Sequence, residues 1–423
     1  FLKYLDAAKN ASGAMSAHSR LTGSCVVAGF VATGLALTLW KKWCSPVLGS
    51  RLHVRLVQSL PRELPKPPAN SGTAACALTP ACIRLLLVTL SSIGSPQATR
   101  IFYEKLFAES PELRELFGDM QSQEHKFVAM WQWVSRTLAA SPESFSNKLR
   151  ALGERHVKYK ARLNHIRSVK RALLDMISIH VPEFLSKDQP LDDVVRAWEA
   201  LLYVFVGEMG PRMLIHEDLQ SFHDALSNDL AAPAGGTCLA LAGAQGASLM
   251  AMAAALTRAP RAGSVERRIV DEAHSQFLKV RSALEELAGL DMAAYCRVMA
   301  SVRQPRLTDS HMRTTAISEA LEQAAQVPLQ VAEWAVAGLK AARAFLPVAA
   351  KSGVGDAGAG AQLLAAACRT ALQNISINTE SMLVAKCAWR HSLNSRARAL
   401  SVGLAELEAD ITTMVAARHT RKA

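Results

Sequence analysis

One histidine has neighbours that would let it hold a metal ion. His156 lies in the run Arg150-Ala-Leu-Gly-Glu-Arg-His-Val-Lys, within a segment of helical periodicity. About 40 residues upstream, the amphipathic segment from Phe102 to Phe117 contains a Pro-initiated turn of helix. Helices with this spacing can close an apolar pocket over one face of an imidazole, and a neutral imidazole is a good iron ligand. The pattern predicts an iron site in a helical pocket.

The elements that position this pocket are predicted to be helices, because the whole chain has the composition of an all-α protein. Half of the residues are hydrophobic and 20% are charged, and alternating β-branched runs are nearly absent. Breaks fall at Ser95-Pro, Ser110-Pro, Ser141-Pro and Val181-Pro. The first three place Ser ahead of Pro, which is a signal for the start of a helix.

Composition divides the chain into three parts. Residues 1–76 are basic, and they hold an uncharged stretch over 21–40 followed by a Pro-rich linker. Helical periodicity dominates 78–214, and an Ala-rich helical part follows over 219–417. A run of glycines over 351–360 predicts a further loop in that last part.

The stretch 21–40 has two interpretations. Its 20 residues would span a bilayer, with Trp40, Lys41 and Lys42 at the interface. The alternative is an uncleaved targeting segment. Residues 21–42 therefore predict either a membrane anchor or targeting to an organelle.

Charge and cysteine usage bear on the partners, the metal sites and the compartment that the sequence predicts. The net charge is +12, but no aromatic-studded basic module or Cys/His finger accompanies it, so we predict no nucleic-acid partner. The eight cysteines are scattered without a Cys-x-x-Cys, which supports neither a zinc site nor a disulfide framework. A reducing intracellular compartment is the plainer inference.

The segment from about 84 to 212 resembles single-domain globins of the bacterial and neuroglobin-like kind. Three runs carry the resemblance: Phe102-Tyr-Glu-Lys-Leu-Phe, Leu116-Phe and Asp119-Met-Gln-Ser-Gln-Glu-His-Lys-Phe. They match the second helix, the following short helix and the distal helix of that family. His156 stands in an Ala-Leu-Gly-x-x-His-Val context that is common at the proximal position. The resemblance implies a globin domain over 78–214 that holds haem b through the His156 nitrogen.

The same resemblance implies a set of residues around the haem, namely Tyr103, Phe117, Gln123, Lys126 and Phe127. A Tyr hydroxyl and a Gln amide can both donate to iron-bound dioxygen. Slippage by one residue would place Glu124 over the iron instead, and His125 could occupy the sixth position. Tyr103 could also be a plain core aromatic.

Flavohaemoglobins carry a proximal Tyr and a reductase, and this chain departs from both features. Ile166 occupies the position of that Tyr, and no nicotinamide or flavin motif follows. The departures disfavour an autonomous dioxygenase. They favour a protein that binds or senses a diatomic gas, either oxygen or NO.

From about Leu219 to Ala417 the chain resembles the cyclodeaminase domain of formiminotransferase-cyclodeaminase and the related methenyltetrahydrofolate cyclohydrolases. Five runs match in order, beginning at Ala231-Ala-Pro-Ala-Gly-Gly-Thr, Asp291-Met-Ala-Ala-Tyr, Ala325-Gln-Val-Pro-Leu, Gly355-Asp-Ala-Gly-Ala and Asn374-Ile-Ser-Ile-Asn. The resemblance implies a helical bundle, a tetrahydrofolate derivative as substrate and a homodimer formed through this domain.

The resemblance also implies site residues. Asp291 is the catalytic candidate with Asp356 in support, since an aspartate among helices can act as acid or base on an imidazoline ring. Gly235 and Gly236 precede a helix whose backbone donors could meet a folate carboxylate, and Asn378 would be a further polar contact. Asp356 could instead cap a helix, and Asn378 could satisfy buried backbone.

Two function classes follow. The chain is either a haem protein joined to a folate one-carbon enzyme, or a gas-binding sensor whose C-terminal domain is a non-catalytic oligomerisation scaffold. The loop Ala234-Gly-Gly-Thr departs from the Gly-Gly-Gly-Ser of the family, and the formiminotransferase half is missing from this sequence. Both departures keep the scaffold alternative open.

Overall fold

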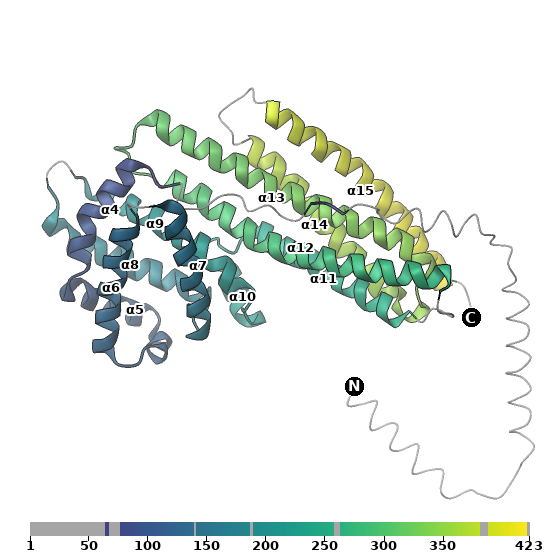
Figure 1. The fold of residues 1–423 in the computed structure, drawn as a ribbon, viewed down its shortest axis with the longest axis horizontal. Coiled ribbons are helices and arrows are strands. Elements are labelled where there is room, and N and C mark those ends of the chain that lie inside the picture. Colours follow the sequence, from purple (N-terminus) through teal and green to yellow (C-terminus); the bar gives the residue numbers. More distant parts are fainter. Residues whose placement is uncertain are drawn as a thin grey trace, which may run out of the picture. The chain divides into compact units, whose positions relative to one another are not determined.

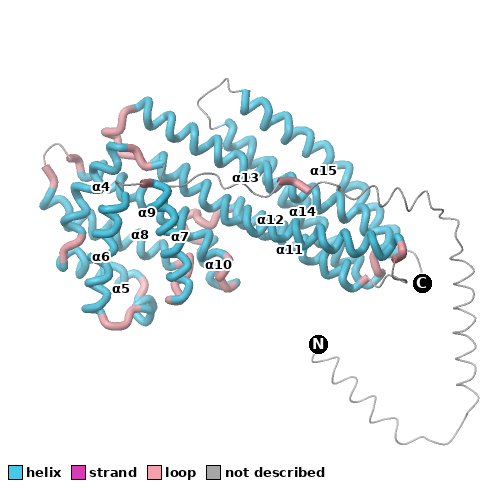
Figure 2. The backbone as a smooth tube through the Cα atoms, viewed as in Figure 1, coloured by secondary structure: helices cyan, strands magenta, loops and turns pink. Residues whose placement is uncertain are grey.

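A computed structural model describes residues 64–66, 77–138, 141–186, 189–257, 263–380 and 388–420. All regular elements in these ranges are helices, which confirms the predicted all-α fold class (Figure 2). Residues 56–423 form one compact unit. The predicted membrane or targeting segment at 21–42 lies outside the described residues.

The first group of helices covers the part predicted as the globin domain. Its elements in chain order are α4 Pro80–Ile93, α5 Pro96–Glu109, η3 Pro111–Leu116, α6 Met120–Leu138, α7 Pro142–Lys158, α8 His165–His180, η4 Val181–Phe184, α9 Leu191–Leu214 and α10 Leu219–Leu226. The side chains of Ser95 and Ser141 accept hydrogen bonds from the amides of Ala98 and Ser144 and cap α5 and α7. The Ser-Pro pairs therefore start helices as predicted.

Aromatic rings fill the interior of this group. Trp131 of α6 meets Trp198 of α9 at 5.0 Å between ring centroids, and Phe102 stacks on Phe127 at 4.8 Å. Helix α9 is buried on nearly all of its faces, so it packs against elements on every side. It contacts α4, α7 and α8 within the group and α12 outside it.

The second group forms a bundle. Its elements are α11 Gly235–Leu256, α12 Val265–Val302, α13 Ser310–Phe345, η5 Leu346–Val348, η6 Lys351–Gly353, α14 Val354–Glu380 and α15 Ala388–Thr420. Helices α11, α12, α13 and α14 each contact the next, α14 closes the ring on α11, and α15 packs on α13 and α14 (Figure 1). Gly246 and Gly360 bring α11 and α14 so close that a methyl group on Gly246 would lie 2.6 Å from the Gly360 carbonyl oxygen.

The loop predicted over 351–360 is mostly wrong. Only η6 and its flanks are non-α, and α14 begins at Val354. Gly355, Gly358 and Gly360 are helical, and Gly358 and Gly360 face α15 and α11 across close contacts. Glycine is used here for helix packing and not for a turn.

One helix of the described residues, Gly235–Leu256, is long and apolar enough to cross a membrane. Half of its most apolar window is buried, because α11 lies against α12 and α14. Its composition is that of a helix packed inside a bundle.

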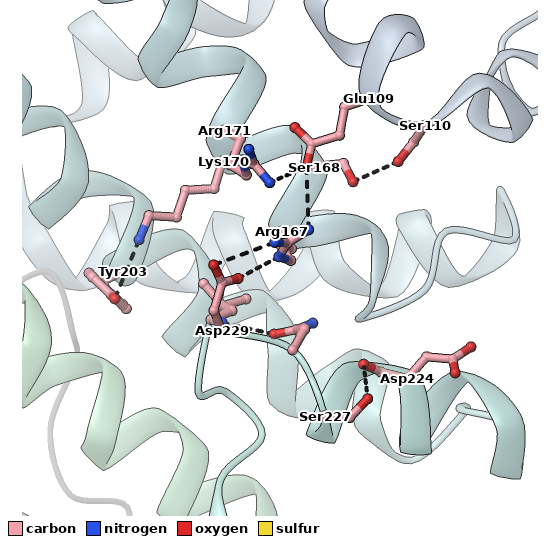
Figure 3. A network of polar contacts seen from close by, with 12 residues as sticks. Glu109, Ser110, Arg167, Ser168, Lys170, Arg171, Tyr203, Asp224, Ser227 and Asp229 are labelled. Carbon is pink, nitrogen blue, oxygen red and sulfur yellow. Dashed lines mark hydrogen bonds and ion pairs between the residues drawn. The ribbon is translucent and has the colours of Figure 1, made fainter.

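Polar contacts join the two groups where α8, α9 and α12 meet. The buried carboxylate of Asp193 on α9 accepts the amides of Arg306 and Leu307, which lie between α12 and α13. Arg167 of α8 pairs with Glu109 of α5 and with Asp229, which lies in the connection between α10 and α11 (Figure 3). Lys170 of α8 lies over the ring of Tyr203 on α9. The Asp193 hydrogen bonds therefore hold α9 against the connection between α12 and α13, and Lys170 joins α8 to α9.

Candidate functional site

Asp291 of α12 lies at the N-terminus of α11. The Thr237 hydroxyl donates to Asp291 Oδ2 at 2.9 Å, and the Thr237 amide also donates to this carboxyl. The first N–H groups of a helix have no partner within the helix, and they favour a negative charge. The helix terminus that the sequence suggested for a folate carboxylate is therefore occupied by a side chain of the protein.

Gly236 makes this approach possible. A methyl group on Gly236 would lie 2.6 Å from Asp291 Cγ and 2.7 Å from Oδ2, closer than real side chains come. Gly235, one residue earlier, has no neighbour within 4 Å of such a methyl group. The two glycines thus differ: the second provides the space for the carboxyl, and the first borders open space.

Burial sets the protonation of Asp291. Desolvation raises its pKa to about 6, and the two hydrogen bonds from Thr237 oppose that rise. A carboxyl with this pKa is populated in both protonation states near neutral pH. It can therefore take a proton and return it within one reaction.

A small pocket opens beside the carboxyl. It is lined by Gly236, Leu239, Asp291, Pro328, Val331, Ala367, Ala371 and Asn374. Its volume of about 10 Å³ is the space of roughly one water molecule. The walls are apolar except for Asp291 and the Asn374 amide, so a polar ligand would meet these two groups.

Asn378, predicted as a ligand contact, lies one turn beyond Asn374 on α14 and has another partner. Its Nδ2 donates to the carbonyl of Ala324 at 3.3 Å. Pro328 lies within α13 and has no N–H to give to that carbonyl four residues earlier. The Asn378 amide replaces the missing donor, which is the backbone alternative that the sequence left open.

Asp356 is not brought to the pocket. It lies in the first turn of α14, eleven residues before Ala367, the nearest pocket residue on the same helix. A helix rises about 1.5 Å per residue, so about 16 Å along the axis separate the two. Its catalytic role stays a prediction that this placement does not favour.

His156 is half-buried near the end of α7. Its Nδ1 lies 2.9 Å from the Leu152 carbonyl oxygen, and burial is the main cause that lowers its pKa. A carbonyl accepts only from a protonated nitrogen, so Nδ1 carries the hydrogen and Nε2 keeps its lone pair. A neutral imidazole in this tautomer can ligate a metal through Nε2.

The residues predicted on the opposite side of a haem come together in part. Tyr103 packs edge-on against Phe117 at 5.5 Å and lies 6.0 Å from Phe127. Gln123 is half-buried and Lys126 is exposed. Burial and the carboxylate of Glu124 raise the pKa of Tyr103 to about 12, so Glu124 is the residue whose charge bears on Tyr103.

Sequence reasoning missed Thr237 and Asn374 as site residues. Both stand inside the motifs that pointed to the pocket, but their neighbours in the chain gave no reason to prefer them. Thr237 is 54 positions from Asp291, and Asn374 comes from a third helix. Both residues come close to Asp291 only in the folded chain, so the sequence alone held no signal that could have identified them.

Comparison with known proteins decides the nature of the second group. Residues 218–397 match the family model described as formiminotransferase-cyclodeaminase. These residues are a cyclodeaminase-type domain. The matched range contains the whole Asp291 pocket, so the cyclodeaminase-type domain supplies Gly236, Thr237, Asp291 and Asn374.

Two curated relatives align with this domain. The chain is 31% identical over 172 residues to the formimidoyltransferase-cyclodeaminase of Sus scrofa, which covers 36% of this chain and 31% of that protein. It is 30% identical over 142 residues to the Rattus norvegicus protein, covering 32% and 26%. The chain thus spans about a third or less of the length of these relatives.

Among solved structures, the formiminotetrahydrofolate cyclodeaminase of Thermotoga maritima aligns with a TM-score of 0.44 at 19% identity. The alignment covers 48% of this chain and 98% of that one.

Proposed function

We propose that the cyclodeaminase-type domain, over about 219–417, acts on a one-carbon derivative of tetrahydrofolate, with Asp291 as its acid and base. The family match and the names of the relatives suggest the substrate class. The single observation that carries the proposal is the Asp291 carboxyl, which Thr237 holds beside the pocket and whose pKa burial raises to about 6.

The proposed chemistry is one proton transfer in each direction. When a formimino group closes to an imidazoline ring, a ring nitrogen loses a proton and ammonia leaves with one. When water opens the ring, the water loses a proton and a nitrogen gains one. Asp291 takes the first proton as a carboxylate and returns it as an acid. Thr237 holds Oδ2 in place during both steps, and Asn374 can orient a polar group of the substrate.

The test uses the full chain with 5-formiminotetrahydrofolate and 5,10-methenyltetrahydrofolate in separate assays. We expect turnover of at least one substrate and a loss of about 100-fold or more in kcat for Asp291→Asn, the range that one acid–base group contributes. Asp271→Asn is the matched control, because Asp271 is an exposed aspartate on the same helix and pairs with Arg267. Turnover that is indifferent to Asp291→Asn contradicts the proposal.

The scaffold alternative predicts a different result. A non-catalytic domain would show no turnover of either substrate in the wild type or in Asp291→Asn. It would still be expected to form the predicted homodimer, which sedimentation measures. The combination of a dimer with no turnover would favour the scaffold over the enzyme.

A second candidate function rests on His156, and we infer that residues 78–214 bind haem in the manner of a globin. The Nδ1 contact to Leu152 and the lowered pKa leave Nε2 as a neutral donor, which fits an iron ligand. Tyr103, Phe117 and Phe127 would form an aromatic wall on the far side, and a bound haem would supply iron for a diatomic gas.

This inference is tested by spectroscopy. The full chain is supplied with haem, and its absorption spectrum is compared with that of His156→Ala. His311→Ala is the control, because His311 is an exposed histidine in the first turn of α13, outside residues 78–214. A Soret band lost only in His156→Ala supports the site. No band, or one that His156→Ala leaves unchanged, contradicts it.

A further inference from the structure

Helix α9 touches α12 immediately beside Asp291. Gly210 of α9 faces the side chain of Met292, and a methyl group on Gly210 would lie 3.1 Å from its sulfur and nearer still to its Cε. One turn away, Gly289 of α12 would place such a methyl group 3.2 Å from Pro211 Cβ. The sulfur and Cε are the flexible end of the Met292 side chain, and the side chain is fully buried, so its packed neighbours limit the rotamers that it can adopt instead.

Helix α7 touches α9 at the neighbouring residue. A methyl group on Gly153 would lie 2.8 Å from the carbonyl oxygen and 3.0 Å from the Cα of Met209. Both atoms belong to the backbone, so α9 as a whole would have to move. Gly153 precedes His156 by less than one turn of α7.

These contacts form a continuous packed path from α7 to the candidate catalytic carboxyl. We propose that Gly153, Gly210 and Met292 are positioning residues that set the place of Asp291 against Thr237, so that a displacement of α7 alters the site. The proposal rests on the proposed function for its effect on turnover. The positioning itself can be measured without turnover.

The physical basis is close packing. Packed interiors transmit displacement because their side chains have no free volume to absorb it. Asp291 and Met292 are adjacent on α12, and they face α11 and α9 respectively. A shift of Met292 therefore moves Asp291 relative to Thr237. Loss of the two Thr237 hydrogen bonds would favour the protonated carboxyl, because those bonds oppose the rise of its pKa.

Two other titratable groups near Asp291 do not complicate the interpretation of its titration. The buried thiol of Cys296 lies five residues further along α12, and the charges of Asp291 and of Lys170 on α8 both act on its pKa. Burial raises the pKa of Cys296 well above its usual range, so the thiol stays neutral while Asp291 titrates. Neither group is altered in the variants below.

The first measurement is the pH titration of Asp291 in the full chain, by carbon NMR of aspartate-labelled protein, with the resonance assigned by its absence in Asp291→Asn. We expect Gly210→Ala to raise the pKa of Asp291 by about half a unit or more. Met292→Ala in the same chain makes room for the added methyl group, so the double variant should return close to the Met292→Ala value. Gly403→Ala is the matched control, since Gly403 is helical and has open space at this position.

Gly153→Ala tests the longer step. It should shift the titration of Asp291 in the same direction, although it lies on another helix. If Gly210→Ala or Gly153→Ala fails to fold, Gly289→Ala takes its place, because its methyl group would press on Pro211 of α9 at 3.2 Å. An unchanged or lowered pKa of Asp291 in every variant that folds overturns the proposal. The proposal also fails if the pKa of Asp291 in the double variant is no closer to its value in Met292→Ala than its value in Gly210→Ala is.

The second measurement is turnover of the folate substrate. We expect Gly210→Ala to lower kcat about tenfold and Met292→Ala to restore most of that loss. Absent turnover in the wild type sinks the proposed function alone, and the NMR titration still decides the positioning. A normal kcat in Gly210→Ala together with a shifted titration overturns the effect on catalysis.

Discussion

Aromatic rings are frequent in the interior of the helices from 80 to 214, whereas the bundle α11–α14 buries many alanines and glycines beside its aliphatic side chains. In the first group Trp131, Trp198, Phe145 and Phe205 stand within 6.1 Å of one another in successive ring pairs. In the described bundle helices a single ring pair occurs, Phe277 with Phe345. Large side chains keep helices apart, and small ones bring backbones together. The first interior should therefore be more sensitive to the removal of atoms, and the second to their addition.

The largest effect is expected from truncating a ring. Phe145 is fully buried, so Phe145→Ala should cost about 3–5 kcal/mol of unfolding free energy through lost burial and the cavity left behind. Urea unfolding followed by circular dichroism measures it. Phe184→Ala is the control, because Phe184 is 55% exposed. Equal losses of unfolding free energy in the two variants would contradict the idea that buried rings stabilise the first group.

The matching change in the bundle adds atoms. Gly246→Ala would press a methyl group onto the Gly360 carbonyl, the Leu363 Cβ and the Leu364 amide, mostly backbone that cannot turn aside. We expect a loss toward the upper end of about 1–3 kcal/mol, against a slight gain for Gly403→Ala in an open helical position. A neutral Gly246→Ala would show that α11 and α14 have slack between them.

The stability of the protein should depend on pH through the buried carboxyl of Asp291. Its folded pKa of about 6 exceeds the ordinary 3.8, so the folded state binds the proton more tightly and stability falls as pH rises from about 4 to about 6. Asp291→Asn removes this cost. We expect it to match the wild type near pH 4 and to exceed it by about 3 kcal/mol above pH 7. Parallel urea midpoints across this range would contradict the raised pKa.

The smallest effect concerns the carbonyl that Pro328 leaves without a donor. Asn378→Ala should cost about 1 kcal/mol, because it leaves the Ala324 carbonyl without its hydrogen bond. Pro328→Ala restores a backbone N–H to that carbonyl, so the double variant should show a smaller loss from Asn378→Ala than the wild-type background does. Equal losses in both backgrounds, measured by thermal unfolding, would assign Asn378 another role.

Local signals in the sequence predicted the helix starts well. Ser95 and Ser141 cap helices because their hydroxyls meet amides three residues later, and that interaction needs no distant partner. The all-α class could be predicted as well, because composition and the near absence of alternating β-branched runs are also local properties of the sequence. Glycine was harder to interpret: the run over 351–360 suggested a loop, but Gly360 lies inside α14 and gives space for the close approach of Gly246 on α11.

The candidate site could be predicted only in part. Asp291 and Gly236 were both named from the motifs, yet nothing in the chain indicated that the second glycine makes room for the carboxyl. The partner of Tyr103 illustrates a related limit. A helical register uncertain by one residue exchanges Gln123 for Glu124, and only the fold shows which charge bears on the phenol.

Helix α9 belongs to two neighbourhoods at once. The matched family range begins at residue 218, after α9 has ended at Leu214, yet Gly210 and Pro211 of α9 cover Met292 and Gly289 inside that range. A protein truncated so that it begins at residue 218 would expose this face of α12 to water, next to the Asp291 carboxyl. The packed surroundings of Asp291 therefore extend beyond the matched range and include α9.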